Sequence, residues 1–361
     1  MSLKERDKKH LWHPLTQHKT HPEALAIKKA SNCLLEDYNG DIYIDAIASW
    51  YTCMYGHCNP EIVSAVQKQM ETLDQIIFSG FTHAPAVELS EALIAILPEN
   101  QNKLFFSDNG STTVEIAIKM ALQYHFNLGD KKDTLIAFEN GFHGDTFGAM
   151  SVSGLSVYNG PFEDFSLKVI RIPVPNKTNT DKILKELSHL NSIHNIAAFI
   201  YEPIVQGAAG MKMHCEKGLD AIIRYCNSNR IITIADEVMT GFGKTGKKFA
   251  SDYMQNKPEI MCLSKALTAG LLPMGITSCS DMIYNAFYSN DLSKGFFHGH
   301  TYSANPLACM AAVSGIKLLN STKIQEQIKS ISKSHQEFTE ILKTKKNVNE
   351  VRCKGVILAL D

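Results

Sequence analysis

The sequence lacks a long hydrophobic run and has no surplus of one charge. Its longest apolar stretches, such as residues 196–201, are far too short to span a bilayer. The 36 Lys and Arg residues nearly balance the 37 Asp and Glu residues, which leaves a net charge of −1. Because no field of a single sign is present to attract nucleic acid or an anionic membrane, we expect neither as a partner.

The sequence also lacks the features of a secreted protein. Residues 1–14 are charged and contain no apolar stretch of the kind that a secretory signal requires. Nine cysteines are scattered without a CxxC pair, which is typical of reduced thiols in the cytosol. Cys53 and Cys58 flank His57, but no second ligand pair stands at a suitable spacing, so a metal site is not expected. These observations predict a cytoplasmic protein.

Short apolar stretches alternate with amphipathic stretches over most of the chain, which predicts an α/β fold. The apolar stretches predict strands at residues 103–107, 134–138, 168–172, 196–201, 231–236, 260–264 and 275–280. Helical periodicity is found at residues 60–73, 85–97, 111–126, 216–229, 306–318 and 322–345. Nearly continuous apolar strands between helices indicate a mostly parallel central sheet with helices on both faces.

The two ends of the chain differ from this middle part. Residues 34–46 predict a hairpin whose turn is Asn39-Gly40-Asp41. Residues 351–361 predict one strand that stops without a turn or cap, so we expect the chain to be truncated there. We predict three regions: an N-terminal arm with part of a small α+β domain (1–60), a large α/β domain (61–304), and the start of a C-terminal small domain (305–361).

In parallel sheets, ligands bind outside the carboxyl ends of the strands. The residues that follow the predicted strands are therefore candidates for a binding site, and those after two of the strands are uncharged. Gly110 and Ser111 open a helix after residues 103–107, and a helix N-terminus offers free N–H groups to a phosphate. An ordinary helix cap is the simpler alternative there. Phe142 lies in a glycine-rich turn after residues 134–138, where its ring either stacks on a planar ligand or packs in the core.

Charged candidates follow two further strands. Asp236 ends the strand 231–236, where a buried acid is costly unless a positive group meets it. Lys265 follows the strand 260–264 at its apolar end, where partial burial favours the neutral, nucleophilic amine. Each residue alone is a weak signal. Together they supply an amine, a carboxylate, a phosphate site and a ring partner, which are the groups that pyridoxal phosphate needs.

A glycine-rich segment at residues 241–246 offers an alternative, a nucleotide-binding P-loop. The segment does not meet the GxxxxGK[ST] spacing, so this hypothesis is much weaker.

Longer segments resemble the class III aminotransferase family. IADEVMTGFGKTGKKFA (234–250) and CLSKALTAG (262–270) are similar to the family signature, and positions 236 and 265 lie 29 residues apart, as is usual there. GHTYSANPLA (299–308) resembles the segment that reaches the cofactor phosphate of the partner subunit. The resemblance implies pyridoxal 5'-phosphate as cofactor, the fold type I of such transferases, and a homodimer with shared active sites.

The resemblance also implies a role for each candidate residue. Lys265 would bond to the cofactor aldehyde and move the proton, while Asp236 would pair with the pyridinium nitrogen. Gly110 and Ser111 would bind the phosphate, with Thr301 reaching across from the other subunit. The remaining implied contacts are a ring stack on the cofactor by Phe142 and a substrate site formed by Trp50, Tyr51 and Gly299.

Other stretches narrow the resemblance to the branch of the family that acts in biotin biosynthesis. They include HLWHPLTQH (10–18), ASWYTCMYGHCNPEI (48–62) and NGFHGDTFGAMSVSG (140–154). The implied reaction converts 8-amino-7-oxononanoate to 7,8-diaminononanoate, with S-adenosylmethionine as the expected amino donor and lysine as the alternative. Two other functions stay open: an ω-aminotransferase of the ornithine, acetylornithine or 4-aminobutyrate type, and a truncated protein that binds the cofactor without turnover.

Three residues depart from the family pattern. Leu15 stands where an aromatic residue is usual, which removes a hydroxyl contact to substrate. Lys244 replaces the usual arginine and loses its fork geometry. His300 replaces a common proline before Thr301. The arginine that clamps the substrate carboxylate in the family would lie beyond Asp361, so no clamp is assigned.

Overall fold

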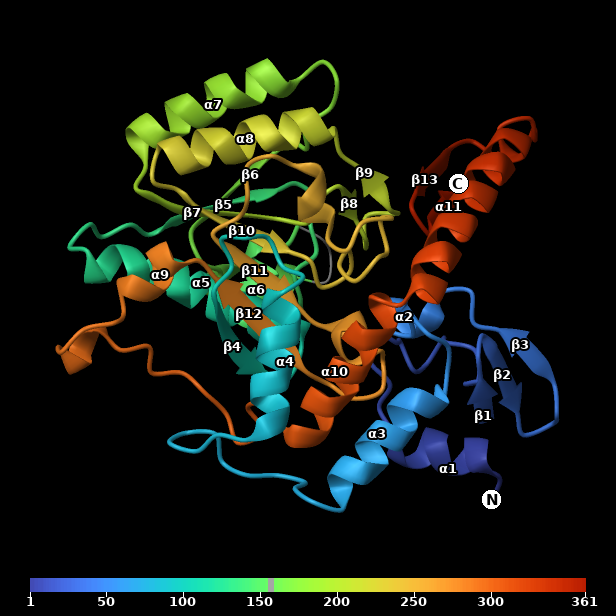
Figure 1. Ribbon diagram of the computed structural model, residues 1–361. Helices are drawn as coiled ribbons and strands as arrows, with labels where there is room; N and C mark the ends of the chain where they lie inside the picture. The colour runs from blue at the N-terminus through green and yellow to red at the C-terminus, as the bar shows by residue number, and fades with distance from the viewer. Residues whose placement is uncertain (155–158) are drawn as a thin grey trace.

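A computed structural model describes residues 1–154 and 159–361 and places a seven-stranded sheet at the centre of the molecule (Figure 1). The strand order is β4-β12-β11-β10-β7-β5-β6. Neighbouring strands are parallel from β11 to β6, whereas β12 is antiparallel to both of its neighbours. This topology confirms the predicted mostly parallel sheet.

All seven predicted strands are present, with small differences at their ends. Their bounds are β4 (Lys103–Ser107), β5 (Thr134–Phe138), β6 (Val169–Ile172), β7 (Ile196–Tyr201), β10 (Ile232–Asp236), β11 (Ile260–Leu263) and β12 (Gly275–Cys279). Side chains alternate between the two faces of the sheet, as the pleat requires. In β5, Ile136 and Phe138 belong to one core cluster, and Leu135 and Ala137 belong to the other.

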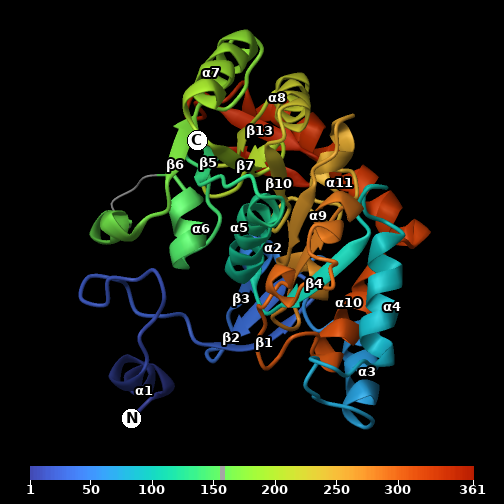
Figure 2. The same ribbon diagram turned by 90° about the vertical axis from the view of Figure 1, so that its left-hand side faces the viewer.

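Helices cover both faces of this sheet (Figures 1 and 2). One face packs against α4 (Ala84–Ile94), α7 (Thr180–Ile193), α8 (Glu216–Ser228) and α10 (Pro306–Leu319). The other face packs against α5 (Gly110–Asn127), α6 (Phe147–Val152) and α9 (Asp281–Asn285). The sequence pattern predicted α4, α5, α8 and α10 but missed α7, which lies beside α8 in both views.

The N-terminal part holds α1 (Leu3–His10) and a small antiparallel sheet of β1 (Ile27–Ser31), β2 (Leu34–Asp37) and β3 (Ile42–Ile44). The pairing of β2 with β3 confirms the predicted hairpin, while β1 was not predicted. A short turn, α2 (Ala48–Tyr51), leads to α3 (Pro60–Met70), which packs against α10. Two short strands, β8 (Val205–Gln206) and β9 (Lys212–Met213), form a further ribbon.

The C-terminal part holds α11 (Thr322–Leu342) and then a hairpin of β13 (Val351–Lys354) and β14 (Ile357–Leu360). The prediction of a single strand over residues 351–361 was therefore wrong. The chain reverses at Gly355, whose φ of +62° favours glycine. A Cβ atom at this position would lie 2.2 Å from the carbonyl carbon of Thr245, so close packing also requires a glycine. No helix in the two described ranges is long and apolar enough to cross a membrane.

Candidate active site

Most of the residues predicted from the strand ends meet at one edge of the sheet. Asp236 ends β10, and Lys265 follows β11, its parallel neighbour. Phe142 follows β5, and Gly110 follows β4. Because the carboxyl ends of parallel strands share an edge, these four residues face a common region.

Asp236 forms a buried pair with His143 on the neighbouring loop. Its Oδ2 atom lies 2.7 Å from the Nδ1 atom of His143, and its Oδ1 atom accepts a hydrogen bond from the N–H of Val238 at 3.1 Å. Burial by itself lowers the pKa of His143, but the hydrogen bond and the charge of Asp236, with a contribution from Glu202, raise it above its ordinary value. The pair holds a carboxylate at the strand end in a fixed orientation.

Lys265 places its amine in the same buried region. Burial lowers the pKa of Lys265, and the negative charges of Asp236 and Glu202 oppose that shift. The Nζ atom lies 5.3 Å from the centre of the Tyr51 ring, within the range of a cation–π contact. A desolvated amine with a lowered pKa is the form that attacks an aldehyde carbon.

The start of α5 supplies an anion site beside these charges. The first N–H groups of a helix have no partner within the helix, and its dipole end is positive. The Asn109 side chain caps only the N–H of Thr112, at 3.0 Å. A Cβ atom on Gly144 would lie 2.1 Å from the Oγ atom of Ser111, so the loop that carries Phe142 packs directly on the helix start. The amine, acid and anion site together fit pyridoxal phosphate.

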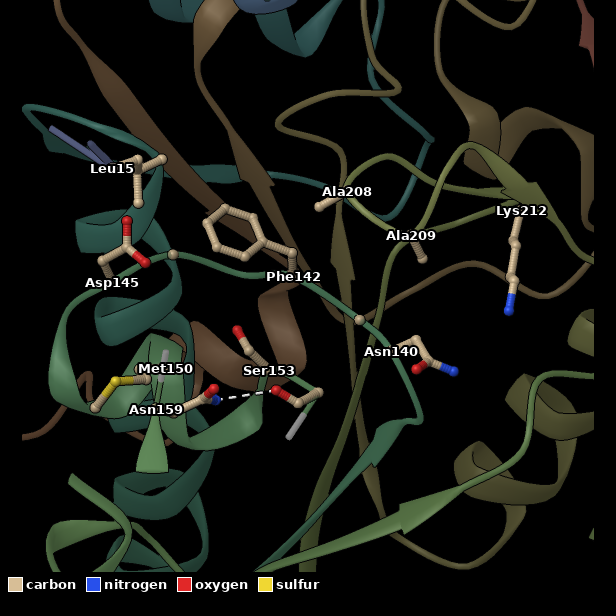
Figure 3. A pocket seen from close by; sticks show the side chains of 13 residues that line it. Leu15, Asn140, Phe142, Asp145, Met150, Ser153, Asn159, Ala208, Ala209 and Lys212 are labelled. Atoms are coloured by element: carbon tan, nitrogen blue, oxygen red, sulfur yellow. Dashed lines mark hydrogen bonds between the residues drawn. The ribbon is translucent and has the colours of Figure 1, made fainter. Parts of the chain in front are cut away.

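Phe142 also borders a cavity of about 500 Å³. Its ring is 43% exposed, and Figure 3 shows it extended between Asp145 and Ala208. The cavity walls are partly apolar and comprise Leu15, Asn140, Gly141, Phe142, Gly144, Asp145, Met150, Ser153, Gly154, Asn159, Ala208, Ala209 and Lys212. Leu15, noted above as a departure from the family pattern, thus contributes an apolar wall to the same cavity.

Glu202 is a site residue that the sequence reasoning missed. It directly follows β7, so the strand-end rule that located Asp236 could have found it. Its side chain is buried and accepts hydrogen bonds from the N–H groups of Phe142 (3.0 Å) and Gly207 (2.9 Å). Burial raises the pKa of Glu202 to about 7, although the charge of His143 lowers it.

Trp50 and Tyr51 lie in a left-handed turn. Residues 48–51 all have φ between +48° and +70°, although none is a glycine, and such a conformation costs roughly 1–2 kcal/mol per residue. The buried Lys244 amine donates to the Tyr51 carbonyl and lies 3.0 Å from the Met54 sulfur. Burial, then the charge of Lys265, lowers the pKa of Lys244 to about 7. Tyr51 therefore reaches the site, while Trp50 is 56% exposed.

The structure does not bring Gly299 and Thr301 into contact with these groups. Both are exposed, and the Thr301 carbonyl accepts a hydrogen bond from the Gln75 side chain at 2.7 Å. Among the interactions of the described residues, none joins either position to Lys265 or Asp236. The role of Thr301 in the phosphate site of a partner subunit and that of Gly299 in the substrate site both stay predictions.

The cysteine pair noted in the sequence serves a different purpose. The Cys53 sulfur lies 3.3 Å from His57 Nδ1, and His57 Nε2 lies 2.8 Å from Asp45 Oδ2. Asp45 also accepts a hydrogen bond from the Ser49 hydroxyl at 2.7 Å, so this chain of contacts braces the left-handed turn. Within residues 1–154 and 159–361, no three His, Cys, Asp or Glu side chains are grouped to hold a metal ion.

Comparisons with known proteins agree with this geometry. The profile of the aminotransferase class III family matches residues 15–361. The chain is 40% identical over 360 residues to the adenosylmethionine-8-amino-7-oxononanoate aminotransferase of Synechococcus elongatus, covering 98% of this chain and 84% of that protein. It also matches the crystal structure of the enzyme of that name from Methanocaldococcus jannaschii, with a TM-score of 0.95, 33% identity, and coverage of 99% and 84%.

A second solved structure extends the comparison to a cofactor complex. It is an omega transaminase from Pseudomonas jessenii in complex with PMP, with a TM-score of 0.93 and 28% identity. That match covers 100% of this chain and 84% of the transaminase.

Proposed function

The chain belongs to the class III aminotransferase family, and from this premise we propose that it transfers an amino group to 8-amino-7-oxononanoate to give 7,8-diaminononanoate. The enzyme is a transferase that uses pyridoxal phosphate, as the family does. One observation carries the cofactor assignment: Asp236 and Lys265 follow adjacent parallel strands. The substrate assignment is supported by the 40% sequence identity to a relative named adenosylmethionine-8-amino-7-oxononanoate aminotransferase.

Each side chain then has a separate task. The N–H groups of Gly110 and Ser111 would bind the phosphate, and Phe142 would contact the cofactor ring. Asp236, held by His143, would pair with the pyridine nitrogen. When bound, pyridoxal phosphate supplies an electron sink for the carbon that carries the amino group. Lys265 holds the cofactor and then takes and returns the proton at that carbon through its Nζ atom.

The amino donor is part of the same proposal. S-adenosylmethionine is the donor that the names of the relatives indicate, and lysine is the alternative. The cavity beside Phe142 has an apolar wall at Leu15, Met150 and Ala208, which suits the aliphatic chain of either the acceptor or the donor. We place Trp50, Tyr51 and Gly299 around the same substrate path.

We also propose a cytoplasmic homodimer. Thr301 would then reach the phosphate site of the partner subunit. Large apolar side chains are exposed along and near residues 299–302, among them Phe297 at 78% and Tyr302 at 63%. A second copy of the chain would remove them from water. Sedimentation of the purified protein tests the dimer.

A half-reaction tests the substrate assignment. The enzyme is first converted to its pyridoxamine form, and 8-amino-7-oxononanoate is then added alone. We expect the aldehyde absorbance to return and 7,8-diaminononanoate to appear in equal amount. The same experiment with ornithine-derived semialdehyde addresses the ω-aminotransferase alternative. Return of the absorbance with that aldehyde and not with 8-amino-7-oxononanoate would overturn the assignment.

A chemical map tests the cofactor half on its own. Borohydride reduction of the holoenzyme fixes the cofactor to its lysine, and digestion locates the labelled peptide. We expect the label on Lys265. Lys244 is the matched control, because it is a second buried lysine whose pKa is also lowered. A label on Lys244 would contradict the proposed roles.

A further inference from the structure

We propose that Glu202 is a positioning residue of the active site, which joins two loops that line the cavity beside Phe142 and acts with its charge on Lys265. This proposal depends on the proposed function in one respect only, which is the identity of the substrate used to test it. The observations that carry it are hydrogen bonds, burial and the order of the strands.

The two oxygens of Glu202 bind two different loops. Oε2 accepts the hydrogen bond from the N–H of Phe142, and Oε1 accepts the one from the N–H of Gly207. Phe142 lines the cavity, and so does Ala208, which follows Gly207 on the other loop (Figure 3). A single carboxylate therefore fixes the spacing between the ring that faces the cofactor and the wall that faces the substrate.

Glu202 is suited to this task because its neighbours restrict it. Its side chain is 5% exposed, and the strand β7 that carries it is buried along its whole length. A Cβ atom on Gly207 would lie 3.1 Å from the Met239 side chain, so the loop at Gly207 is tightly packed against the segment after β10. A change in the length of the side chain at position 202 must therefore move at least one loop.

The charge of Glu202 has a second target. Three charged or titratable groups face it: His143, Asp236 and Lys265. The negative charge of Glu202 raises the pKa of Lys265, against the effect of burial. The same nitrogen carries the proton when the cofactor is bound, so loss of the charge should favour its deprotonation.

Two variants separate the two roles, and a third is a matched control. Glu202→Gln removes the charge, and one of the two N–H groups then faces an amide NH₂ rather than an acceptor oxygen. Glu202→Asp keeps the charge but is shorter by one methylene. Glu237→Gln changes another fully buried carboxylate, which accepts hydrogen bonds from Thr240, Ala250 and Ser251. Glu237 is absent from the groups that shift the pKa of Lys265 among the described residues.

The experiment measures the cofactor absorbance of each holoenzyme against pH without substrate, and then KM and kcat with 8-amino-7-oxononanoate. We expect the absorbance midpoint of Glu202→Gln to move to lower pH, while Glu202→Asp and Glu237→Gln keep the wild-type midpoint. We expect KM to rise roughly tenfold in Glu202→Asp, because a shift of either loop weakens the contacts that the cavity makes with the substrate.

Two results would overturn the proposal. One is a wild-type absorbance midpoint in Glu202→Gln. The other is a wild-type KM in Glu202→Asp, and this result decides the matter if Glu202→Gln does not fold. If the wild-type enzyme does not act on 8-amino-7-oxononanoate, the proposed function fails, yet the absorbance titration still decides whether Glu202 acts on Lys265.

Discussion

His214 is a buried histidine whose replacement should change how stability depends on pH. Its side chain lies against the Phe138 ring, with ring centres 5.2 Å apart, and is 8% exposed. Neither ring nitrogen has a hydrogen-bond partner among the described residues. Burial lowers the pKa of His214 from 6.5 to about 4. The perturbation is His214→Phe, which keeps a ring in the cluster and removes the titrating group.

The sign and size follow from proton linkage. Between pH 6.5 and about 4, the unfolded chain binds a proton at His214 and the folded chain does not. Stability is therefore lost as the pH falls through this window. At pH 5 the loss works out to about 2 kcal/mol, and below pH 4 it approaches about 3 kcal/mol.

Urea unfolding of both proteins at pH 7.5 and pH 5 measures this contribution. At pH 7.5 the removal of two unpartnered nitrogens should raise the free energy of unfolding of the variant, and the larger ring should lower it, each by roughly 1–3 kcal/mol. The test is therefore the change between the two pH values, in which the packing effects cancel. Between pH 7.5 and pH 5, we expect the free energy of unfolding to fall by about 2 kcal/mol less in the variant than in the wild type. Equal losses in the two proteins would refute the reasoning.

Three further changes probe the site itself. Lys265→Ala should lower the rate of the half-reaction by about 10³-fold, since it removes the group that we propose moves the proton; stopped-flow absorbance measures it. Asp236→Asn should lower the absorbance midpoint of the bound cofactor, because Asp236 raises the pKa of Lys265. Gly144→Ala should weaken cofactor binding about tenfold or more, because its Cβ meets Ser111 at 2.1 Å. Gly129→Ala is the control for that change, with a φ of +77° and no neighbour within 4 Å, and equal cofactor affinities in the two variants would contradict it.

The sequence predicted the sheet well because its strands are uniformly apolar. All five residues of β5 and all six of β7 are buried, and such runs stand out between amphipathic helices. The short antiparallel strand β1 was harder to find, because it is mostly exposed. The reversal at Gly355 was missed for a similar reason: residues 351–361 look like one apolar strand unless the glycine is taken as a turn.

The sequence revealed those site residues whose own side chain suggests their chemistry. It did not reveal features of the site that arise from contacts between residues far apart in the sequence. Lys265 and Asp236 each have a charge at the end of an apolar strand, so the pattern exposed both. The partnership of His143 with Asp236 joins residues 93 positions apart, and no local pattern marks it. The brace formed by Lys244 on the Tyr51 carbonyl likewise depends on tertiary packing.

The order of the strands explains how separate parts of the chain become one site. Asp236 ends β10, while Glu202 and Lys265 come after β7 and β11, the two neighbours of β10 in the sheet, so the three residues lie at the same edge of the sheet. Phe142 and His143 follow β5, the strand next to β7, and the proposed phosphate site lies beyond β12 at the start of α5. Since β12 runs antiparallel between β4 and β11, it brings no carboxyl end to this edge and separates the phosphate site from the amine. An extended ligand with a phosphate at one end and a ring nitrogen at the other therefore matches the sheet, whereas a compact one would leave the anion site or Asp236 without a partner.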